Sequence, residues 1–323
     1  MTVGSLRSIQ RAALLALLSV TAAAAQSTPE PPSWAYITPP ADAKPAPPSK
    51  ASRRVPGSTA TYTDAQVNDH FLAPDWHPAD HPKMPEVVAH GRKPDVYACG
   101  FCHRADGPGG PENASLAGLP YDYILEQMED FKSGKRSTAL PKRAPQAYMI
   151  ALAKIATDEE VQSAAKYFAS LKPRQNIRVV ETSRVPKTYV AGWVLSPKPG
   201  KDVEPLGRRI VEMPENLEDF ESRDTHASFV AYVPVGSLRA GEAIVKGRGL
   251  GPPCASCHAR DLHGHELAPP IAGRSPSYIT RQLYEIQTGV RTGSGVKLMK
   301  AAMARLSPDE MLAVSAYLAS LKP

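Results

Sequence analysis

The chain has 323 residues, 42% of them hydrophobic and 22% charged, so its length suits two domains with linkers and most of it can fold around hydrophobic cores. The formal net charge is only +6 at pH 7, which argues against nucleic acid as a partner and leaves local patches to steer association with other proteins. The 33 prolines indicate long irregular stretches, and the four cysteines all belong to one kind of motif.

Residues 1–25 have the features of a signal peptide. Arg7 and Arg11 supply positive charge before a short apolar run, and Ala23–Ala25 provides the small residues that signal peptidase recognises. We expect cleavage after Ala25 and a periplasmic location. Retention as an anchor is the alternative, but the run is short for a bilayer span. No later stretch is long and apolar enough to cross a membrane, so no stable span is expected.

Residues 26–60 are dense in proline, serine, alanine and lysine. They contain too few large apolar side chains to offset the entropy lost on ordering. The composition therefore predicts a proline-rich disordered tether in front of the folded domains.

An internal repeat dominates the rest of the chain. The same motif occurs twice, as Cys99-x-x-Cys102-His103 and as Cys254-x-x-Cys257-His258. The offset between the copies is 155 residues, and it becomes 150 after five residues are lost from the second copy. Matched pairs include Gln127 with Gln282, Arg136 with Arg291 and Met149 with Met299. The repeat predicts two tandem domains, at residues 61–173 and 237–323.

Each copy is predicted to be mainly helical. Asp122 and Ser277 are candidate N-caps of helices that run to Gly134 and Gly289. The last helix of each copy opens with a capping box, formed by Thr157 with Glu160 and by Ser307 with Glu310. Apolar residues recur along these last helices at helical spacing, which indicates a face packed on the core.

Residues 174–236 lie between the copies and match neither of them. Short segments near residues 179, 189, 210 and 229–233 have strand character, and prolines interrupt the whole stretch. We expect a long irregular connector with one or two short β pairings that wraps over the domain interface. The predicted fold class is therefore mainly α, with minor β in the connector.

The repeated C-x-x-C-H motif is the attachment signature of haem c. Two thiols at this spacing form thioethers with the two vinyl groups of one porphyrin, and the adjacent histidine coordinates the iron. We predict two covalent haems, attached at Cys99, Cys102, Cys254 and Cys257, with His103 and His258 as proximal ligands. A thioredoxin-like pair would need a βαβ context, and a zinc site would need four ligands, so both alternatives fit less well.

The sixth iron ligand must come from farther along the chain. A methionine or a second histidine would close the iron site, whereas an empty position would allow ligand binding or catalysis. Among the eight methionines only Met149 and Met299 match each other, whereas Met128 corresponds to Leu283. We predict Met149 and Met299 as distal ligands, and packing in the core is the alternative.

The proximal histidine usually donates its second ring N–H to a backbone carbonyl. Pro269 is placed to supply that carbonyl in the second copy, and Ala114 is its equivalent in the first. Any residue offers a carbonyl, so the change from proline to alanine affects rigidity more than chemistry.

Other polar residues are weaker candidates. Residues 75–81 contain aspartates and histidines, but prolines make this segment a loop that we expect to pack beside the first haem rather than to bind a metal. Trp193, Arg208 and Arg209 are candidates to face the haem propionates.

These features resemble the tandem di-haem class I cytochromes c, the c-four type of bacterial periplasms. The similarity covers about residues 86–173 and 241–323 and rests on the two motifs, the matched helices and the paired methionines. The resemblance implies two small α domains with His/Met haems, and electron shuttling between a quinol-oxidising complex or dehydrogenase and a terminal acceptor. The family joins its domains by a short linker, so this chain departs from the family in its long connector and in its N-terminal extension.

We therefore expect an electron carrier that acts between redox protein partners and has no substrate chemistry of its own. One alternative is a haem-dependent oxidoreductase, such as a peroxidase or a sulfur-compound oxidising enzyme, which would need an open iron position. Another is a cytochrome subunit docked on a periplasmic dehydrogenase, for which the connector and the tether would provide contacts.

Overall fold

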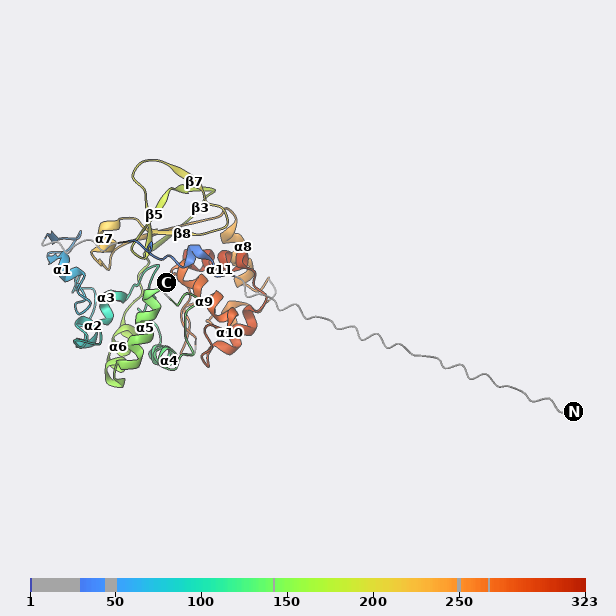
Figure 1. The fold of residues 1–323 in the computed structure, drawn as a ribbon, viewed down its shortest axis with the longest axis horizontal. Coiled ribbons are helices and arrows are strands. Elements are labelled where there is room, and N and C mark those ends of the chain that lie inside the picture. The colour runs from blue at the N-terminus through green and yellow to red at the C-terminus, as the bar shows by residue number, and fades with distance from the viewer. Residues whose placement is uncertain (2–29, 44–50, 142, 249–250, 267) are drawn as a thin grey trace. The chain divides into compact units, whose positions relative to one another are not determined.

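Figure 1 shows the fold in a computed structural model, which describes Met1 and residues 30–43, 51–141, 143–248, 251–266 and 268–323. The chain divides after Glu30, and all that follows concerns the part from Pro31 to Pro323. Apart from Met1, the expected signal peptide lies outside the described residues. None of the described helices is long and apolar enough to cross a bilayer.

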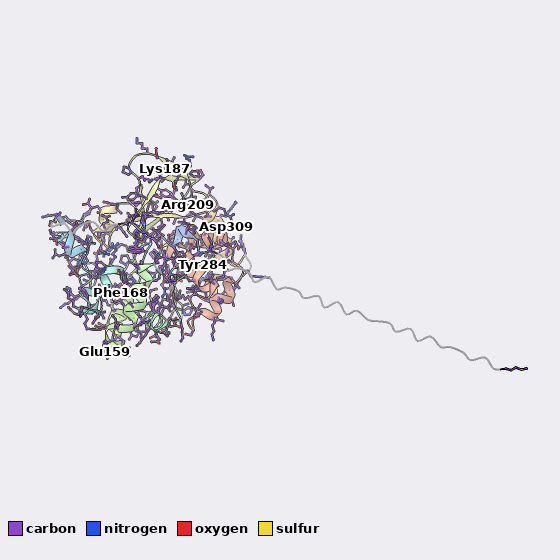
Figure 2. All side chains as sticks on the ribbon, viewed as in Figure 1. Glu159, Phe168, Lys187, Arg209, Tyr284 and Asp309 are labelled. Carbon is purple, nitrogen blue, oxygen red and sulfur yellow. The ribbon has the colours of Figure 1, made fainter. Side chains whose placement is uncertain are left out.

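The first copy of the repeat is helical, and a two-stranded antiparallel pair precedes it. Its elements are β1 (Ser52–Arg53), β2 (Tyr62–Thr63), α1 (Asp64–Val67), α2 (Glu86–Ala89), α3 (Cys99–His103), α4 (Tyr121–Lys132), α5 (Ala144–Ile155) and α6 (Asp158–Ser170). The core lies where α6 packs against α4 and α2, and Phe168 of α6 is 1% exposed there. Figure 2 labels Phe168 in this core and Glu159, an exposed residue at the start of the same helix.

The second copy repeats this arrangement (orange to red in Figure 1). Its elements are α8 (Ser237–Val245), the 3₁₀ turn η2 (Cys254–Ser256), α9 (Pro276–Thr288), α10 (Val296–Met303) and α11 (Pro308–Ser320). Helices α8 and α11 approach each other closely at Gly241 and Ala313. A Cβ at Gly241 would lie 2.0 Å from the Ala313 carbonyl oxygen, so only glycine permits this approach.

The predicted helix ends of the last helices are confirmed. The Thr157 hydroxyl accepts the Glu160 N–H at 3.2 Å, and the Ser307 hydroxyl accepts the Glu310 N–H at 3.3 Å, so both capping boxes form. The left-handed glycine expected just beyond the earlier helix of each copy is also present, since Gly134 has φ of 78°.

The two predicted N-caps are wrong. Helix α4 begins directly after Pro120, so Asp122 lies inside the first turn and makes no cap. In α9 the Ser275 hydroxyl accepts the Tyr278 N–H at 3.2 Å, and Ser277 is already helical. The reason is Pro276, whose fixed φ suits the first helical position and shifts the cap to the residue before it.

The segment expected to be a disordered tether, residues 26–60, differs from that expectation where it is described. Residues 33–35 form the 3₁₀ turn η1 (Ser33–Ala35), and Tyr36 is 2% exposed against α9. The Tyr36 hydroxyl donates to Glu285 at 3.1 Å, and the Arg281 guanidinium donates to the Ala35 carbonyl at 2.7 Å. A few aromatic side chains thus supply the apolar area that the overall composition lacks.

The connector contains more β structure than expected. Its elements are β3 (Ile177–Glu181), β4 (Arg184–Pro186), β5 (Thr188–Ala191), β6 (Val194–Pro197), β7 (Val203–Pro205), β8 (Val211–Pro214), α7 (Leu217–Glu221) and β9 (Phe229–Val233). A three-stranded sheet has the order β3-β9-β8, in which β3 runs parallel to β9 and β8 runs antiparallel to it. Two further antiparallel pairs, β4 with β7 and β5 with β6, lie outside this sheet. Ile177 and Phe229 pack against α11, which fixes the sheet on the second copy.

A buried carboxylate also joins the connector to the second copy. Glu212 of β8 is 4% exposed, and its Oε2 accepts the Ser275 hydroxyl at 2.8 Å and the Ser277 N–H at 3.0 Å. Burial raises the pKa of Glu212, and these hydrogen bonds act in the opposite direction. Glu212 therefore caps the start of α9 from outside the helix.

The two copies meet at a reciprocal set of side-chain hydrogen bonds. Equivalent residues of the repeat take part, namely Tyr123, Gln127 and Arg136 with Tyr278, Gln282 and Arg291. Arg136 donates to Gln127 in its own copy at 3.0 Å and to Gln282 across the interface at 3.0 Å. Arg291 donates to Gln282 at 3.0 Å and to Gln127 at 2.7 Å. Each arginine also reaches the other copy's tyrosine hydroxyl, at 3.2 Å for Tyr278 and 3.0 Å for Tyr123.

Main-chain contacts support this interface. The backbones at Arg136 and Arg291 form an antiparallel bridge, with the Ser137 N–H donating to the Val290 carbonyl and the Thr292 N–H to the Lys135 carbonyl. The interface is thus built by the repeat itself, since the same positions of both copies face each other.

We expect Glu212→Ala to lower the free energy of unfolding by about 1–3 kcal/mol, because the buried N–H of Ser277 loses its acceptor. Glu212→Gln keeps an acceptor oxygen and removes the buried charge, so it should remain close to the wild type. Denaturant unfolding followed by circular dichroism measures both variants. Equal losses in the two would contradict the capping role.

We expect Arg136→Ala and Arg291→Ala each to lower the free energy of unfolding by about 1–3 kcal/mol. The double variant should lose more than the sum, because each glutamine oxygen keeps one donor in either single variant and loses both in the double. Arg178→Ala is the control, since its ion pair with Glu215 is exposed and should contribute little. Strict additivity would show that the two arginines do not share one network.

Candidate functional site

The first motif forms the short helix α3, which brings its three functional side chains together. Cys99, Cys102 and His103 lie within little more than one helical turn. The His103 Nδ1 lies 2.8 Å from the Ala114 carbonyl oxygen, and the residue is 7% exposed. Burial lowers the pKa of His103, which favours the neutral imidazole, and the carbonyl places its proton on Nδ1. The Nε2 atom is thereby left as a metal ligand.

The second motif is arranged in the same way. Cys254 begins the turn η2, and the His258 Nδ1 lies 2.8 Å from the Pro269 carbonyl oxygen. Burial lowers the pKa of His258 as well. The prediction that Ala114 and Pro269 supply these carbonyls is confirmed.

A cavity in the first copy has both predicted axial ligands, His103 and Met149, in its wall. Much of the wall is apolar, as a porphyrin requires; its apolar residues include Leu116, Leu119, Ile124, Met128 and Phe131. The residues present therefore fit a haem whose iron lies between an imidazole and a thioether. Met128 lines the same cavity, so the first copy offers a second thioether that its repeat partner Leu283 does not.

The polar part of this wall comes partly from the second copy. Arg136 and Gln282 of the interface network line it, and so does Arg281 of α9. Arg281 is 2% exposed and donates to two backbone carbonyls, but its Nε has no hydrogen-bond partner among the described residues. Buried guanidinium groups with spare donors suit the propionate carboxylates of a haem.

In the second copy the predicted distal residue lies on a helix. Met299 is on α10 and packs, partly buried, against the same apolar cluster as Cys254 and Ile271. Met149 likewise lies on a helix, α5. Both methionines are thus on the helix that precedes the last helix of their copy.

Three of the four cysteines, Cys99, Cys102 and Cys254, do not have the character of reactive thiols. Burial raises the pKa of Cys99 to about 12, and it also raises the pKa values of Cys102 and Cys254. Within the described ranges, no three His, Cys, Asp or Glu side chains gather in a geometry suited to a metal ion. The raised pKa values of these three thiols disfavour the redox-thiol interpretation of the motif.

The weaker candidates have structural roles. In the loop 75–81, His77 Nε2 lies 2.9 Å from Asp224 of the connector and its ring stacks on His226, with centroids 3.7 Å apart. His81 contacts Asp75 at 3.2 Å and the hydroxyl of Tyr167 at 3.0 Å. The loop therefore joins the connector to α6.

The predicted propionate partners in the connector are not in the cavity wall. Arg208 pairs with the exposed Asp309, and Arg209 pairs with Glu204 at 2.6 Å. Figure 2 labels Arg209 and Asp309. Sequence reasoning missed Arg281, which occupies the wall instead; its repeat partner is Glu126, so the repeat offered no signal for it.

Both copies of the repeat match a known protein family. The family model described as Cytochrome c matches residues 91–172 and 241–322, half of the chain. A cytochrome c4 of Azotobacter vinelandii is 26% identical over 239 residues, covering 69% of this chain and 84% of that protein. A thiosulfate dehydrogenase electron acceptor of Thiomonas intermedia (strain K12) is 26% identical, covering 70% of this chain and 80% of that protein. The solved structure of reduced cytochrome c4 from Pseudomonas stutzeri aligns with a TM-score of 0.46 at 23% identity, over 69% of this chain and 93% of that one.

The matched segments contain both Cys-x-x-Cys-His motifs and end with the last helix of each copy. The chain therefore belongs to the cytochrome c family, as a tandem di-haem electron-transfer member with two covalently bound c-type haems.

Proposed function

We propose that the protein carries electrons in the periplasm between redox proteins, with one His/Met haem in each domain. The observation that carries this proposal is the cavity of the first copy, whose wall includes both His103 and Met149. A ligand on each side closes the iron to substrates, which suits a carrier better than an open-site enzyme.

Each residue then has a defined part. Cys99 and Cys102 hold the first haem by thioether bonds, and Cys254 and Cys257 hold the second. His103 and His258 provide the proximal imidazoles, whose orientation is fixed by the carbonyls already described. Met149 and Met299 provide the distal thioethers, which favour reduced iron more than a second histidine would. The bound haem supplies a one-electron Fe(III)/Fe(II) couple.

The domain interface supports transfer between the two centres. Arg136 and Gln282 belong both to the reciprocal hydrogen-bond network and to the wall of the first cavity. The network therefore holds the second copy directly against the first haem site. The side chains of this contact are buried, and a buried contact between the domains suits electron transfer from one haem to the other.

Export and partners follow from the same proposal. Residues 1–25 support secretion by a signal peptide, and haem attachment through C-x-x-C-H suits a chain whose four cysteines form no other arrangement. The donor is a quinol-oxidising complex or a dehydrogenase, and the acceptor is a second redox protein.

A second candidate is a cytochrome subunit that works with one dehydrogenase. It is favoured by relatives in Thiomonas intermedia and Stutzerimonas stutzeri that are named thiosulfate dehydrogenase electron acceptors. Affinity purification of the tagged protein from its native host separates the two: a stoichiometric dehydrogenase favours a subunit, and recovery of the cytochrome alone favours a free carrier.

We expect the intact mass of the purified protein to exceed that of the polypeptide by two haems. Cys99→Ala with Cys102→Ala should remove one haem mass, and Cys254→Ala with Cys257→Ala should remove the other, because covalent retention needs the thioethers. Mass spectrometry and haem absorbance count the haems in the wild type and in each variant. A wild-type protein with no haem or only one would overturn the proposal.

We expect Met149→Leu and Met299→Leu each to remove about half of the thioether-to-iron absorption band of the oxidised protein, because each deletes one distal ligand. The matched controls are Met128→Leu, in the wall of the same cavity as Met149, and Met303→Leu, buried in the second core. Both controls should keep the full band. Loss of the band in Met128→Leu, but not in Met149→Leu, would transfer the ligand role to Met128.

A further inference from the structure

A turn of the connector rests directly on the first haem-attachment motif. Arg223 at this turn donates from Nη1 to the Phe101 carbonyl at 3.1 Å and from Nε to the Val67 carbonyl at 2.8 Å. Its guanidinium carbon lies 3.6 Å from the centroid of the Phe101 ring. Phe101 lies between the two cysteines of the motif, so the guanidinium of Arg223 contacts the segment that binds the haem.

The flanking residues of the turn keep it in place. The Trp76 indole N–H donates to the Ser222 carbonyl at 2.7 Å, and Asp224 contacts His77. Trp76 is 1% exposed. Arg223 itself has a left-handed φ of 59°, a conformation that a non-glycine residue adopts only where its surroundings hold it. The fold therefore holds the contact between Arg223 and Phe101 in place.

A second arginine lies at the same place. Arg104 follows His103 directly and is 2% exposed, with its guanidinium carbon 4.9 Å from the Phe220 ring centroid. Its nearest described carboxylate oxygen is on Glu112, 3.9 Å from Nη2, which is too far for a hydrogen bond. Among the described residues its Nη1 has no hydrogen-bond partner.

The charges around this motif therefore do not cancel. Glu112 acts electrostatically on both Arg104 and Arg223. Asp106 and Asp224 also act on Arg104, but they are themselves paired, Asp106 with Arg174 and Asp224 with His77. Burial, followed by the charge of Arg104, lowers the pKa of Arg223 to about 10, so Arg223 remains protonated at neutral pH. The site retains positive charge in a place where water screens it poorly.

The second motif does not reproduce this arrangement. The repeat partner of Arg104 is Ala259, which has the same left-handed backbone, with φ of 64° against 69°, but no charge. The partner of Phe101 is Ser256, which offers no ring for a guanidinium to stack on. The two attachment segments thus share a backbone and differ in charge.

We propose that Arg223 of the connector, together with Arg104, raises the reduction potential of the haem in the first domain above that of the haem in the second. Oxidised iron carries one more positive charge than reduced iron, so a fixed, poorly screened positive charge nearby favours the reduced form. The effect concerns the equilibrium of one electron between two centres and involves no bond made or broken. This inference rests on the proposed di-haem function and assigns the connector a part in it, as a tuning element.

The test is a potentiometric titration of the full chain, resolved into two one-electron components. Met149→His assigns the components, because replacing the thioether by imidazole lowers the potential of the first haem. We expect the first haem to be the higher component in the wild type. Arg223→Gln should lower only that component, by about a tenfold change in its reduction equilibrium, or 59 mV for one electron. Arg104→Gln should act in the same direction, and Glu112→Gln should raise the same component.

Further variants separate charge from structure. Arg223→Lys keeps the charge and should preserve most of the wild-type potential, whereas a merely structural role would make it behave like Arg223→Gln. Arg178→Gln removes an exposed connector arginine paired with Glu215, and it should leave both components unchanged.

Two failures are distinguishable. If Arg223→Gln keeps both haems and the thioether-to-iron band but neither component moves, this inference is wrong and the proposed function stands. This inference is also wrong, and the proposed function still stands, if the first haem has the lower reduction potential of the two in the wild type. If the wild type lacks two haems or lacks the band, the proposed function itself fails.

Discussion

Both haem sites depend on a hydrogen bond from a motif histidine to a main-chain carbonyl. In each copy the imidazole Nδ1 lies 2.8 Å from the carbonyl oxygen of the residue 11 positions later. This contact determines the tautomer, directs the other ring nitrogen to the metal and closes the loop that follows the motif. Because the acceptor belongs to the backbone, alanine in one copy and proline in the other serve equally well.

The repeat also explains how the two domains associate. Arg136 and Arg291 occupy equivalent positions, and each donates to the glutamines of both copies. An interface made of the same residues on both sides is self-complementary, as in a symmetric dimer. The elements that form each domain therefore also form this interface between the two copies.

The connector and the N-terminal segment make the two halves different. Glu212 caps a helix of the second copy, Arg223 rests on the motif of the first, and Tyr36 packs against α9. None of these contacts has a counterpart in the repeat. Two haems in identical surroundings would have the same reduction potential, so electrons would have no preferred haem. Residues that have no counterpart in the other copy can make the two potentials differ, and these residues therefore matter for function.

The sequence by itself determined the family, the two haems, the capping boxes and the pairing of Met149 with Met299, because these rest on local spacing and on comparison of the two copies. It did not determine the N-caps of α4 and α9; in α9, Pro276 moves the cap from Ser277 to Ser275. Only the tertiary structure decided that Arg281 lines the first cavity and that Arg223 reaches the first motif. The physical reason is the distance along the sequence between the residues that interact. Helix ends and attachment motifs depend on residues close together in the chain, whereas buried charges such as Arg223 contact residues more than a hundred positions away.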